Sequence, residues 1–531
     1  MHAPKVDTLK AELARALRLT ADVSPWAVGV LFVLVMGLVA IPVSTHPLPP
    51  LSDYFNNLAR AYVITAIGSD PDLQRFYAIE WQVVPNLMID LVVPVLHRFM
   101  TIYLAGQVFI VTAFFLMLSG TMALNRALFG RWSAVPLVAA VLIYNEVLLV
   151  GVVNYVFGIG LSLWAPTAWI ALRERAWPWR FAVSTLFALA LFACHLFAVG
   201  LYGLGLLAFE SQRLWATRKE PLRPRLLDFV ATGLPFVPVA ALLLASPTMD
   251  LAGQTFWEPW GKFEGLQLVV TVYYLSIGFG IAVLMIAAIA LAARLRLLRL
   301  HPVGWALLAV GLAVYVAMPR AIFGSHLADE RLPVALAFML IACLDLDMRE
   351  WRVRYAFAVF LAGLLALRLA EVQIAWNGLA RELAAFRQSV MALERGARIL
   401  VVHADRDAYW DERWRVSDLQ FMHAASLATI ERSALVSTTF SVKGKQILHV
   451  RKPYRKSVDA NDGHPPQAAW LRDAEARAAK YGAAHWTRWQ QDFDYVYVLF
   501  AKRSDPNPDE RRLALAAAGP GFKLYRVIKP R

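Results

Sequence analysis

The sequence has little cysteine and a small share of charged residues. Cys194 and Cys343 are its only two cysteines, and both lie inside apolar segments, which excludes a disulfide framework and a thiolate metal site. Charged residues make up 17% of the 531 residues and hydrophobic residues 59%, and the apolar residues form long unbroken blocks. An ordinary soluble protein is therefore excluded, and a polytopic membrane protein is predicted.

Several functional motifs are also missing. There is no Gly-rich phosphate-binding loop, no dinucleotide-binding fingerprint and no internal repeat. The net charge of +14 does not indicate nucleic-acid binding, because Lys and Arg cluster in short segments between the apolar blocks. We therefore exclude a nucleic-acid partner and attribute the basic charge to membrane topology.

The apolar blocks predict eleven membrane-spanning helices. A bilayer core about 30 Å thick needs roughly 20 apolar residues of helix. The block 181–209 is too long for one span and short for two, so we interpret it as a hairpin that turns near His195. The remaining nine blocks are 26–43, 101–124, 134–150, 155–172, 228–246, 267–293, 302–318, 332–347 and 353–371.

Charge asymmetry between the connecting segments predicts the orientation. With the hairpin, the inner segments hold 20 Lys or Arg in 74 residues, whereas the outer loops hold 6 in 100 residues. The positive-inside rule then places the amino end in the cytoplasm and, after eleven spans, the carboxyl end outside.

The composition changes near residue 372. The chain from there to 531 is charged and carries short strand-like segments at 397–402, 446–452, 493–500 and 522–528, with helical patterns between them. We predict an all-α polytopic membrane bundle over 1–371 and an extracytoplasmic α/β domain over 372–531.

The largest membrane-proximal outer loop, 44–100, contains an amphipathic helix that begins near Asp53. Asp53, Asn56, Asn57 and Arg60 form its polar stripe at i, i+3, i+4 and i+7 spacing, opposite an apolar face. Such a helix is expected to lie at the membrane interface, with Ser52 as a cap. A structural role for Asp53, complementing the helix dipole or pairing with Arg60, is also compatible with the pattern.

The stretch "PPLSDYFNNLARAYVI", followed by "RFYAIEWQVVPNLMIDLVVP", resembles the first outer loop of GT-C-type integral membrane glycosyltransferases, and in particular a bacterial branch with an Asp-x-x-Asn-x-Leu-Ala-Arg motif. The resemblance implies a GT-C-like bundle in the bacterial inner membrane with a periplasmic carboxyl-terminal domain. It implies that Asp53 is catalytic. Asn56, Asn57 and Arg60 on the same polar stripe are then candidate substrate contacts, as is Glu80, for which a solvated loop face is the alternative.

The resemblance also implies the partners. These are a sugar donor on a polyprenyl phosphate, an envelope glycan or lipid as acceptor, and the surrounding membrane lipids. A carboxylate such as Asp53 can take the proton of an acceptor hydroxyl while the lipid phosphate leaves. The sequence does not determine the sugar, the acceptor or the oligomeric state.

Further candidates for substrate binding lie in other outer segments. Arg320 and Arg331 suit a phosphate, because the guanidinium fork binds it bidentately. His326, Asp329 and Glu330 lie in the same loop, "PRAIFGSHLADERLP", where an ion pair that anchors a helix end is an equal alternative. His195 lies at membrane depth, where ionisable residues often line functional cavities, although a histidine satisfied by a carbonyl is the commoner case.

No cofactor is required by the sequence. Asp53, Glu80 and Asp329 offer hard oxygen ligands for Mg or Mn, but no spacing demands a metal, and the question stays open. Two other functions are compatible with the sequence. A GT-C-like scaffold without catalysis fits the single acid at the exit of the first span, where many relatives have a pair. A transporter fits the bundle but not its nearly acid-free spans.

Overall fold

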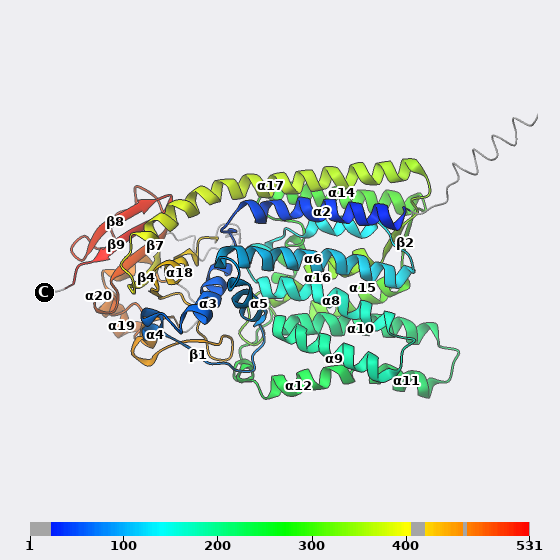
Figure 1. Cartoon of the computed structure of the whole chain (residues 1–531), viewed down its shortest axis with the longest axis horizontal. Coiled ribbons are helices and arrows are strands. Elements are labelled where there is room, and N and C mark those ends of the chain that lie inside the picture. Colours follow the sequence, from blue (N-terminus) through cyan, green and yellow to red (C-terminus); the bar gives the residue numbers. More distant parts are fainter. Residues whose placement is uncertain (1–22, 405–419, 460–464, 530–531) are drawn as a thin grey trace, which may run out of the picture.

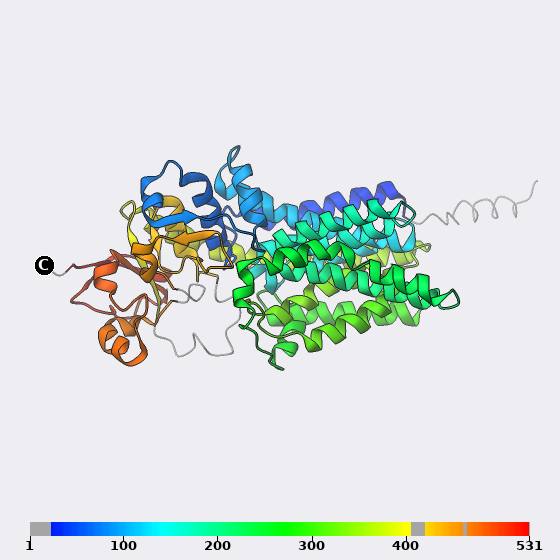
Figure 2. The same cartoon turned by 90° about the horizontal axis from the view of Figure 1, so that it is seen from below.

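The protein is described by a computed structural model that covers residues 23–404, 420–459 and 465–529. A long helical bundle occupies one end of the molecule, and a mixed domain sits on the other (Figure 1, Figure 2). We call residues 392–529 the outer domain, residues 46–101 the first loop, and the end of the bundle beside them the outer end.

The bundle is an array of roughly aligned helices (Figure 1). Its helices are α2 (Pro25–Thr45), α6 (Ile102–Phe129), α8 (Val153–Ala171), α9 (Trp177–Cys194), α10 (Leu196–Ala216), α11 (Leu222–Ala231), α12 (Val237–Leu244), α14 (Leu275–Arg294), α15 (Pro302–Ala317), α16 (Ala328–Ala342) and α17 (Trp351–Met391). The short β2 (Leu298–Leu300) and β3 (Leu344–Leu346) pair antiparallel at the inner end.

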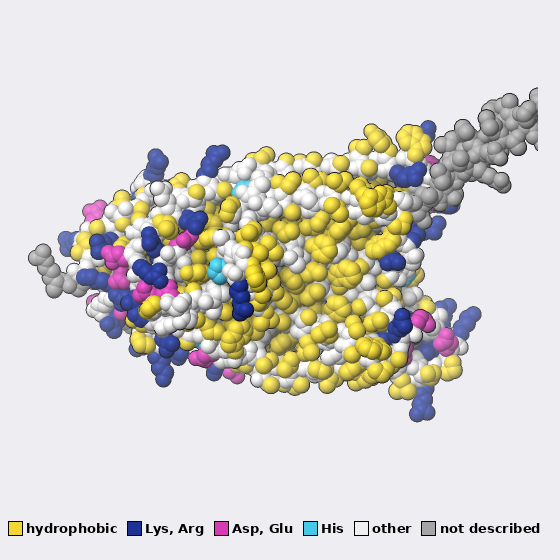
Figure 3. Space-filling model, in the orientation of Figure 1, with side chains coloured by type: hydrophobic (Ala, Val, Ile, Leu, Met, Phe, Trp, Pro, Cys, Tyr) yellow, Lys and Arg dark blue, Asp and Glu magenta, His cyan; other side chains and the backbone are white. Residues whose placement is uncertain are grey.

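The surface of the bundle is that of a multi-pass membrane protein. Within the described residues, six helical segments are long and apolar enough to cross a membrane: α2, α6, α9, the continuous stretch of α11 and α12, α14 and α17. Hydrophobic side chains cover the middle of the face seen in Figure 3, whereas Lys, Arg, Asp and Glu gather towards the two ends. The predicted all-α membrane bundle is confirmed.

The predicted hairpin is present. α9 ends at Cys194 and α10 begins at Leu196, so the break falls on His195, which has an extended backbone (φ −172°, ψ 142°). α9 has 18 residues and α10 has 21, and the turn between them brings His195 to the outer end of the bundle.

The predicted span at 134–150 is wrong as a continuous α-helix. The segment forms a 3₁₀ helix, η1 (Val135–Leu142), and the short α7 (Glu146–Val150). Asn145 between them donates to the Leu142 and Ile143 carbonyls and accepts from the Leu148 N–H. The segment is buried in the bundle, so its free backbone groups are satisfied by protein and need no unbroken helix.

The last helix of the bundle links its two ends. α17 has 41 residues and runs without interruption through the position near 372 where the composition changes. Its first half lies along α2 and α14, and its second half reaches the sheet of the outer domain (Figure 1).

The outer domain is an α/β unit, as predicted. Its five-stranded sheet has the order β5-β4-β7-β9-β8, in which β4 pairs parallel with β5 and β7, and β9 pairs antiparallel with β7 and β8. The strands are β4 (Arg398–His403), β5 (Leu435–Val436), β7 (Tyr495–Ala501), β8 (Leu513–Gly519) and β9 (Gly521–Val527). The short helices α18 (Leu427–Arg432), α19 (Ala474–Tyr481) and α20 (Trp489–Asp492) connect them.

The first loop packs against the outer domain. It contains α3 (Tyr54–Ala66), α4 (Pro71–Phe76), β1 (Tyr77–Ile79) and α5 (Met88–His97). The strand predicted at 446–452 forms β6 (Leu448–Val450), and it pairs antiparallel with β1 instead of joining the main sheet. α3 is therefore held between protein surfaces, and nine of its thirteen residues are buried.

Candidate active site

A cavity of about 340 Å³ lies where the outer end of the bundle meets the first loop and the outer domain. Its walls come from segments far apart in the sequence, including the start of α3, the turn between α9 and α10, and the loop before α16. The titratable side chains that line it are Asp53, His195, His326, Arg331, His423 and Lys445. Among the described lining residues, Asp53 is the one carboxylate.

Asp53 is placed by a close approach between two turns. Its backbone N–H donates to the Val150 carbonyl at 2.8 Å. A Cβ atom at Gly151 would lie 2.8 Å from that nitrogen, and Gly151 has φ +85°, so this turn requires glycine. Asp53 is the N-cap residue of α3, but its side chain makes no capping hydrogen bond. The carboxylate is thus directed to the cavity instead of the helix end.

His423 of the outer domain faces Asp53. Its Nε2 lies 3.6 Å from the Asp53 Oδ1, and the ring is buried against Phe440 with centroids 4.8 Å apart. Nothing in the local sequence around His423 identified it, because its partner lies 370 positions earlier and no motif joins the two.

Arg331 lies in the first turn of α16 and is 8% exposed. Its Nη1 is 3.3 Å from the Ser325 Oγ, and the negative charge of Asp53 interacts with its guanidinium. In the described part of the chain, no carboxylate oxygen lies within ion-pair distance of Arg331. A cation is therefore held at the base of the cavity close to Asp53.

His195 lines the cavity as a neutral donor. Its Nδ1 accepts the Phe197 N–H at 3.2 Å, so in the neutral ring the proton is on Nε2. Burial, together with the charge of Arg331, lowers the pKa of His195 to about 3. The ring is flanked by Tyr155 and Phe197. A His that stays uncharged can donate a hydrogen bond but is a poor base.

Two more cavity residues come from facing loops. Lys445 of the outer domain donates from Nζ to the Gly324 carbonyl at 2.7 Å, which ties the outer domain to the loop before α16. His326 of that loop also lines the cavity, with its ring 5.8 Å from that of Phe256. The sequence indicated His326 but not Lys445, which lies in the unremarkable stretch "SVKGKQ".

Some residues of the polar stripe of α3 line the cavity, and others attach the helix to neighbouring elements. Asn57 lines the cavity and its Nδ2 lies 3.4 Å from the Gly151 carbonyl. Asn56 bonds instead to the outer domain, donating to the Thr438 carbonyl and accepting from the Phe440 N–H. Arg60 forms a buried bidentate pair with Asp90, at 2.7 and 3.0 Å, and not with Asp53.

Arg320, Asp329 and Glu330 form a separate cluster against α13 (Gly261–Gln267). Arg320 pairs with Glu258 at 3.1 Å, Glu264 at 3.0 Å and Glu330 at 2.9 Å, and Asp329 pairs with Lys262 at 2.8 Å. These side chains do not line the cavity, so the structure separates Arg320 from Arg331.

The three carboxylates considered as metal ligands do not meet. Asp53 lies in the cavity, Asp329 is paired with Lys262, and Glu80 is on the surface with its side chain 59% exposed, 3.8 Å from the His449 Nε2. Within residues 23–404, 420–459 and 465–529, no group of three or more His, Cys, Asp or Glu side chains is arranged to hold a metal ion.

Comparisons with known proteins give a distant structural likeness. No family profile and no curated protein matches the chain. Among solved structures, it is similar to the crystal structure of ArnT from Cupriavidus metallidurans bound to undecaprenyl phosphate. The match has 10% sequence identity and a TM-score of 0.49, and covers 94% of this chain and 98% of that chain. A likeness at this level does not establish an activity for this chain.

Proposed function

We propose that this protein is a membrane glycosyltransferase that moves a sugar from a polyprenyl-phosphate-linked donor to an envelope glycan or lipid on the outer face of the inner membrane. The observation that carries the proposal is the cavity itself. It holds a carboxylate, Asp53, next to a buried cation, Arg331, at the level where the apolar surface of the bundle ends.

The reaction assigns a role to each charged group. An acceptor hydroxyl attacks the anomeric carbon of the donor sugar, and its proton passes to Asp53 as the new C–O bond forms. The bond from the anomeric carbon to the phosphate breaks, and the lipid phosphate leaves with the electron pair. Arg331 and Lys445 stabilise the negative charge that grows on this phosphate, and the His195 Nε2–H donates a hydrogen bond to it.

His423 supports the carboxylate in this proposal. At 3.6 Å from the Asp53 Oδ1, a small movement brings its Nε2 within hydrogen-bond distance. The pair is then able to share the proton taken from the acceptor. Since His423 belongs to the outer domain and Asp53 to the first loop, the base is complete only when these two parts are docked.

The charge of the chain beyond the membrane bundle supports an anionic partner. Residues 372–531, which comprise the outer half of α17 and the sequence that follows it, hold 26 Lys or Arg and 17 Asp or Glu, a balance of 26 − 17 = +9. A basic surface beside the cavity attracts anionic glycans and anionic lipid headgroups. The sugar and the acceptor remain to be identified by assay.

Asp53→Asn tests the proposal. In liposomes that contain the purified protein, polyprenyl-phosphate-linked sugars and an envelope lipid extract, the variant should show no sugar transfer, with unchanged membrane insertion and thermal unfolding. Glu80→Gln is the matched control, since this exposed carboxylate lies outside the cavity and its loss should leave transfer at the wild-type rate. Full activity of Asp53→Asn would contradict the catalytic role. Absence of transfer by the wild type across the donor series would favour a non-catalytic scaffold.

EDTA treatment tests the metal separately. A glycosyltransferase that needs Mg or Mn loses activity with the chelator and regains it when the ion is restored. Because the described carboxylates do not form a cluster, we expect transfer to persist in EDTA.

A further inference from the structure

Three amide side chains line the first cavity, which is the one that holds Asp53. They are Asn57 of α3, Asn86 of the loop before α5, and Gln446 of the outer domain. Each amide group has one end bound to the protein, whereas its other end has no hydrogen-bond partner in the part of the chain that the structure describes. Asn57 and Gln446 are only 7% and 6% exposed, and polar groups buried to this degree are rarely left without a partner. The unpaired amide ends therefore indicate contacts with a ligand of the cavity.

The orientation of the Asn86 amide is fixed by Asn154 of α8. The Asn154 Oδ1 accepts the Ile89 N–H at 2.7 Å, so the Asn154 Nδ2 has to donate, and it donates to the Asn86 carbonyl at 2.8 Å and to the Asn86 Oδ1 at 2.9 Å. The unpaired end of Asn86 is therefore its Nδ2. Asn86 also has φ +73°, a left-handed conformation that asparagine tolerates better than most residues. The loop thus holds an amide donor at the cavity.

The Gln446 amide is oriented by a backbone N–H. The Val442 N–H donates to the Gln446 Oε1 at 2.9 Å, which leaves Nε2 as the unpaired end. The neighbouring backbone is anchored to the first loop, since the Glu80 N–H donates to the Ile447 carbonyl at 2.9 Å and β6 pairs with β1. Gln446 is therefore a second amide donor, and the docked outer domain holds it in place.

Asn57 supplies an acceptor. Its Nδ2 lies 3.4 Å from the Gly151 carbonyl, so its Oδ1 is the end without a partner. The cavity volume of about 340 Å³ lies in the range of about 300–1,000 Å³ that is typical of small-molecule sites, where a few placed polar groups fix the orientation of the ligand. Two donors and one acceptor suit the hydroxyl and carbonyl oxygens of a sugar.

The charges of the cavity oppose a cationic ligand. Among the described lining residues, Arg331 and Lys445 are cations and Asp53 is the one carboxylate. An ammonium group needs an acceptor for each of its three N–H bonds, and it is repelled by nearby cations. A lining with more donors than acceptors therefore disfavours an amino sugar relative to an uncharged sugar of the same shape.

We propose that Asn86 and Gln446 select the sugar of the lipid-linked donor. Their amide N–H groups donate to hydroxyl or carbonyl oxygens of an uncharged sugar, and the Asn57 Oδ1 accepts from one of its hydroxyls. Asn154 is a positioning residue, because it acts by orienting Asn86. The inference rests on the proposed function, since it takes the sugar of the polyprenyl-phosphate-linked donor as the ligand of the cavity.

Equilibrium binding tests the selection. The purified full-length protein in detergent is titrated by calorimetry with a short-chain polyprenyl phosphate, and with the same lipid phosphate linked to glucose, galactose, mannose, N-acetylglucosamine or glucosamine. The Kd of the sugar-free lipid phosphate divided by the Kd of each sugar-linked form gives a sugar recognition ratio. We expect a ratio of about tenfold for at least one uncharged sugar, as for one or two net hydrogen bonds, and a ratio near unity for glucosamine.

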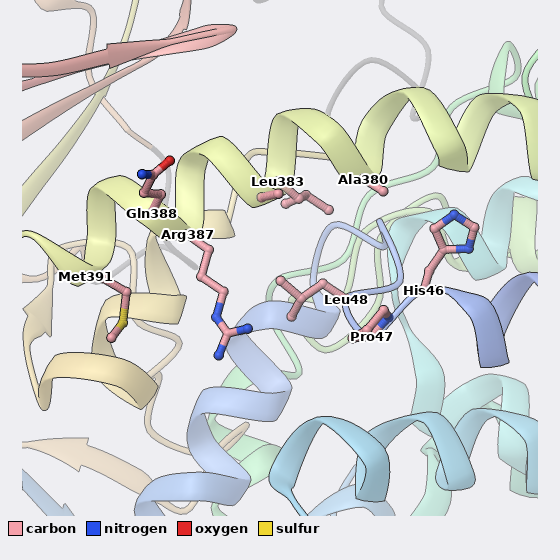
Figure 4. Close-up of a pocket in the computed structure, with 9 residues that line it drawn as sticks. His46, Pro47, Leu48, Ala380, Leu383, Arg387, Gln388 and Met391 are labelled. Carbon is pink, nitrogen blue, oxygen red and sulfur yellow. The ribbon is translucent and has the colours of Figure 1, made fainter.

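Two variants test the amide donors. Asn86→Gly removes the amide and tolerates the positive φ, and it should lower the ratio for the preferred sugar about fivefold. Gln446→Glu replaces the Nε2 donor with an acceptor oxygen of similar shape, so it should lower that ratio and raise the ratio for glucosamine. Gln388→Ala is the matched control and should keep the wild-type ratios. This exposed amide lies on α17 and lines a separate, mainly apolar cavity of about 460 Å³ (Figure 4).

The controls separate sugar recognition from other effects. Asn86→Gly and Gln388→Ala should bind the sugar-free lipid phosphate as the wild type does. Thermal unfolding identifies a misfolded variant, and Gln446→Met, which should lower the ratio about fivefold, then replaces Gln446→Glu. A wild-type preference for glucosamine, ratios near unity for every sugar, or unchanged ratios in the variants of both amides would overturn the proposal. Because binding does not require transfer, intact ratios without transfer in liposomes would reject the glycosyltransferase function alone.

Discussion

The arginines near the first cavity differ in their partners, and this difference assigns their roles. Arg60 pairs with Asp90, and Arg320 is surrounded by three glutamates. Arg331 is also buried, but in the described part of the chain no carboxylate oxygen lies within ion-pair distance of its guanidinium. A buried cation without a paired anion is costly, and an anionic ligand offsets that cost. Under the proposed function, we therefore assign the phosphate contact to Arg331 and not to Arg320.

Arg331→Lys is predicted to weaken donor use more than acceptor use. Lysine keeps the charge but loses the bidentate fork, so the KM for the polyprenyl donor should rise about tenfold, with the KM for the acceptor nearly unchanged. Steady-state kinetics with each substrate varied in turn measure the two values. A tenfold rise in both would indicate a general distortion of the cavity instead.

Sequence and structure agree on part of this site. Asp53, Asn57, His195, His326 and Arg331 were all indicated by the sequence, and the fold brings them to one cavity. A carboxylate at a helix start, a His at a helix break and an Arg in an outer loop are each visible as local patterns. His423 and Lys445 carry no such pattern, because their proximity to Asp53 and Gly324 depends on how the outer domain docks.

At the scale of single elements, α3 shows how one polar stripe serves two purposes. Asp53 and Asn57 face the cavity, whereas Asn56 and Arg60 attach the helix to the outer domain and to α5. All four have the spacing of one helix face, so periodicity alone cannot separate residues that line the cavity from residues that hold the helix in place. The separation requires the positions of the neighbouring elements.

Asp90→Ala is predicted to destabilise the first loop strongly. It leaves the Arg60 guanidinium buried without a counter-charge, which typically costs about 3–5 kcal/mol. Replacing both partners, as Arg60→Met with Asp90→Leu, should recover most of the loss. Chemical denaturation of the three variants in detergent gives the free energies of unfolding, and equal losses in the single and double variants would mean that the charge pair is not the cause.

The sequence predicts three strands of the main sheet close to their observed bounds, and it does not predict β8. β4, β7 and β9 are rich in β-branched and aromatic residues and were found close to their observed bounds. β8 has the sequence LALAAAG, which favours a helix, and it was missed. It forms a strand because pairing with β9 satisfies its backbone, so tertiary context overrides local propensity there.

At the scale of the whole molecule, the first loop and the outer domain interlock. β1 pairs with β6, the Tyr77 hydroxyl donates to the Ala434 carbonyl, and Arg75 donates to the Gly396 carbonyl. Asp70 connects the same two parts, since its carboxylate accepts from Arg395 at 2.6 Å and from Ser433 at 2.5 Å. The cavity lies beneath this junction, so its geometry depends on docking.

The junction is predicted to weaken in acid. Burial acts to raise the pKa of Asp70, but hydrogen bonds from Ser433 and the Leu73 N–H, with the charge of Arg395, outweigh it and hold the pKa below its ordinary value. A carboxyl whose pKa is lowered by folding stabilises the protein above its unfolded pKa of about 3.9, and that contribution is lost as pH falls through the folded value.

Asp70→Asn checks this effect. At neutral pH the variant should unfold at a lower temperature than the wild type. The difference should begin to shrink below about pH 4 and approach zero as the pH falls through the lower pKa of the folded state, where the wild-type carboxyl is protonated too. Hydrogen exchange of the 70–79 and 433–450 amides locates the weakening at the junction. A difference in unfolding temperature that is the same at every pH would assign the loss to something other than the Asp70 charge.

The sequence by itself determined the membrane character of the chain, most of its helices, the break at His195 and the α/β class of the outer domain. These follow from hydrophobicity, period and length, which act over neighbouring residues. Tertiary structure decided that 134–150 is not a continuous helix, that β1 and β6 join the two outer parts, and that Asp53 lines one cavity with Arg331 and His423. Such contacts depend on the docking of segments hundreds of residues apart, and no local pattern encodes that docking.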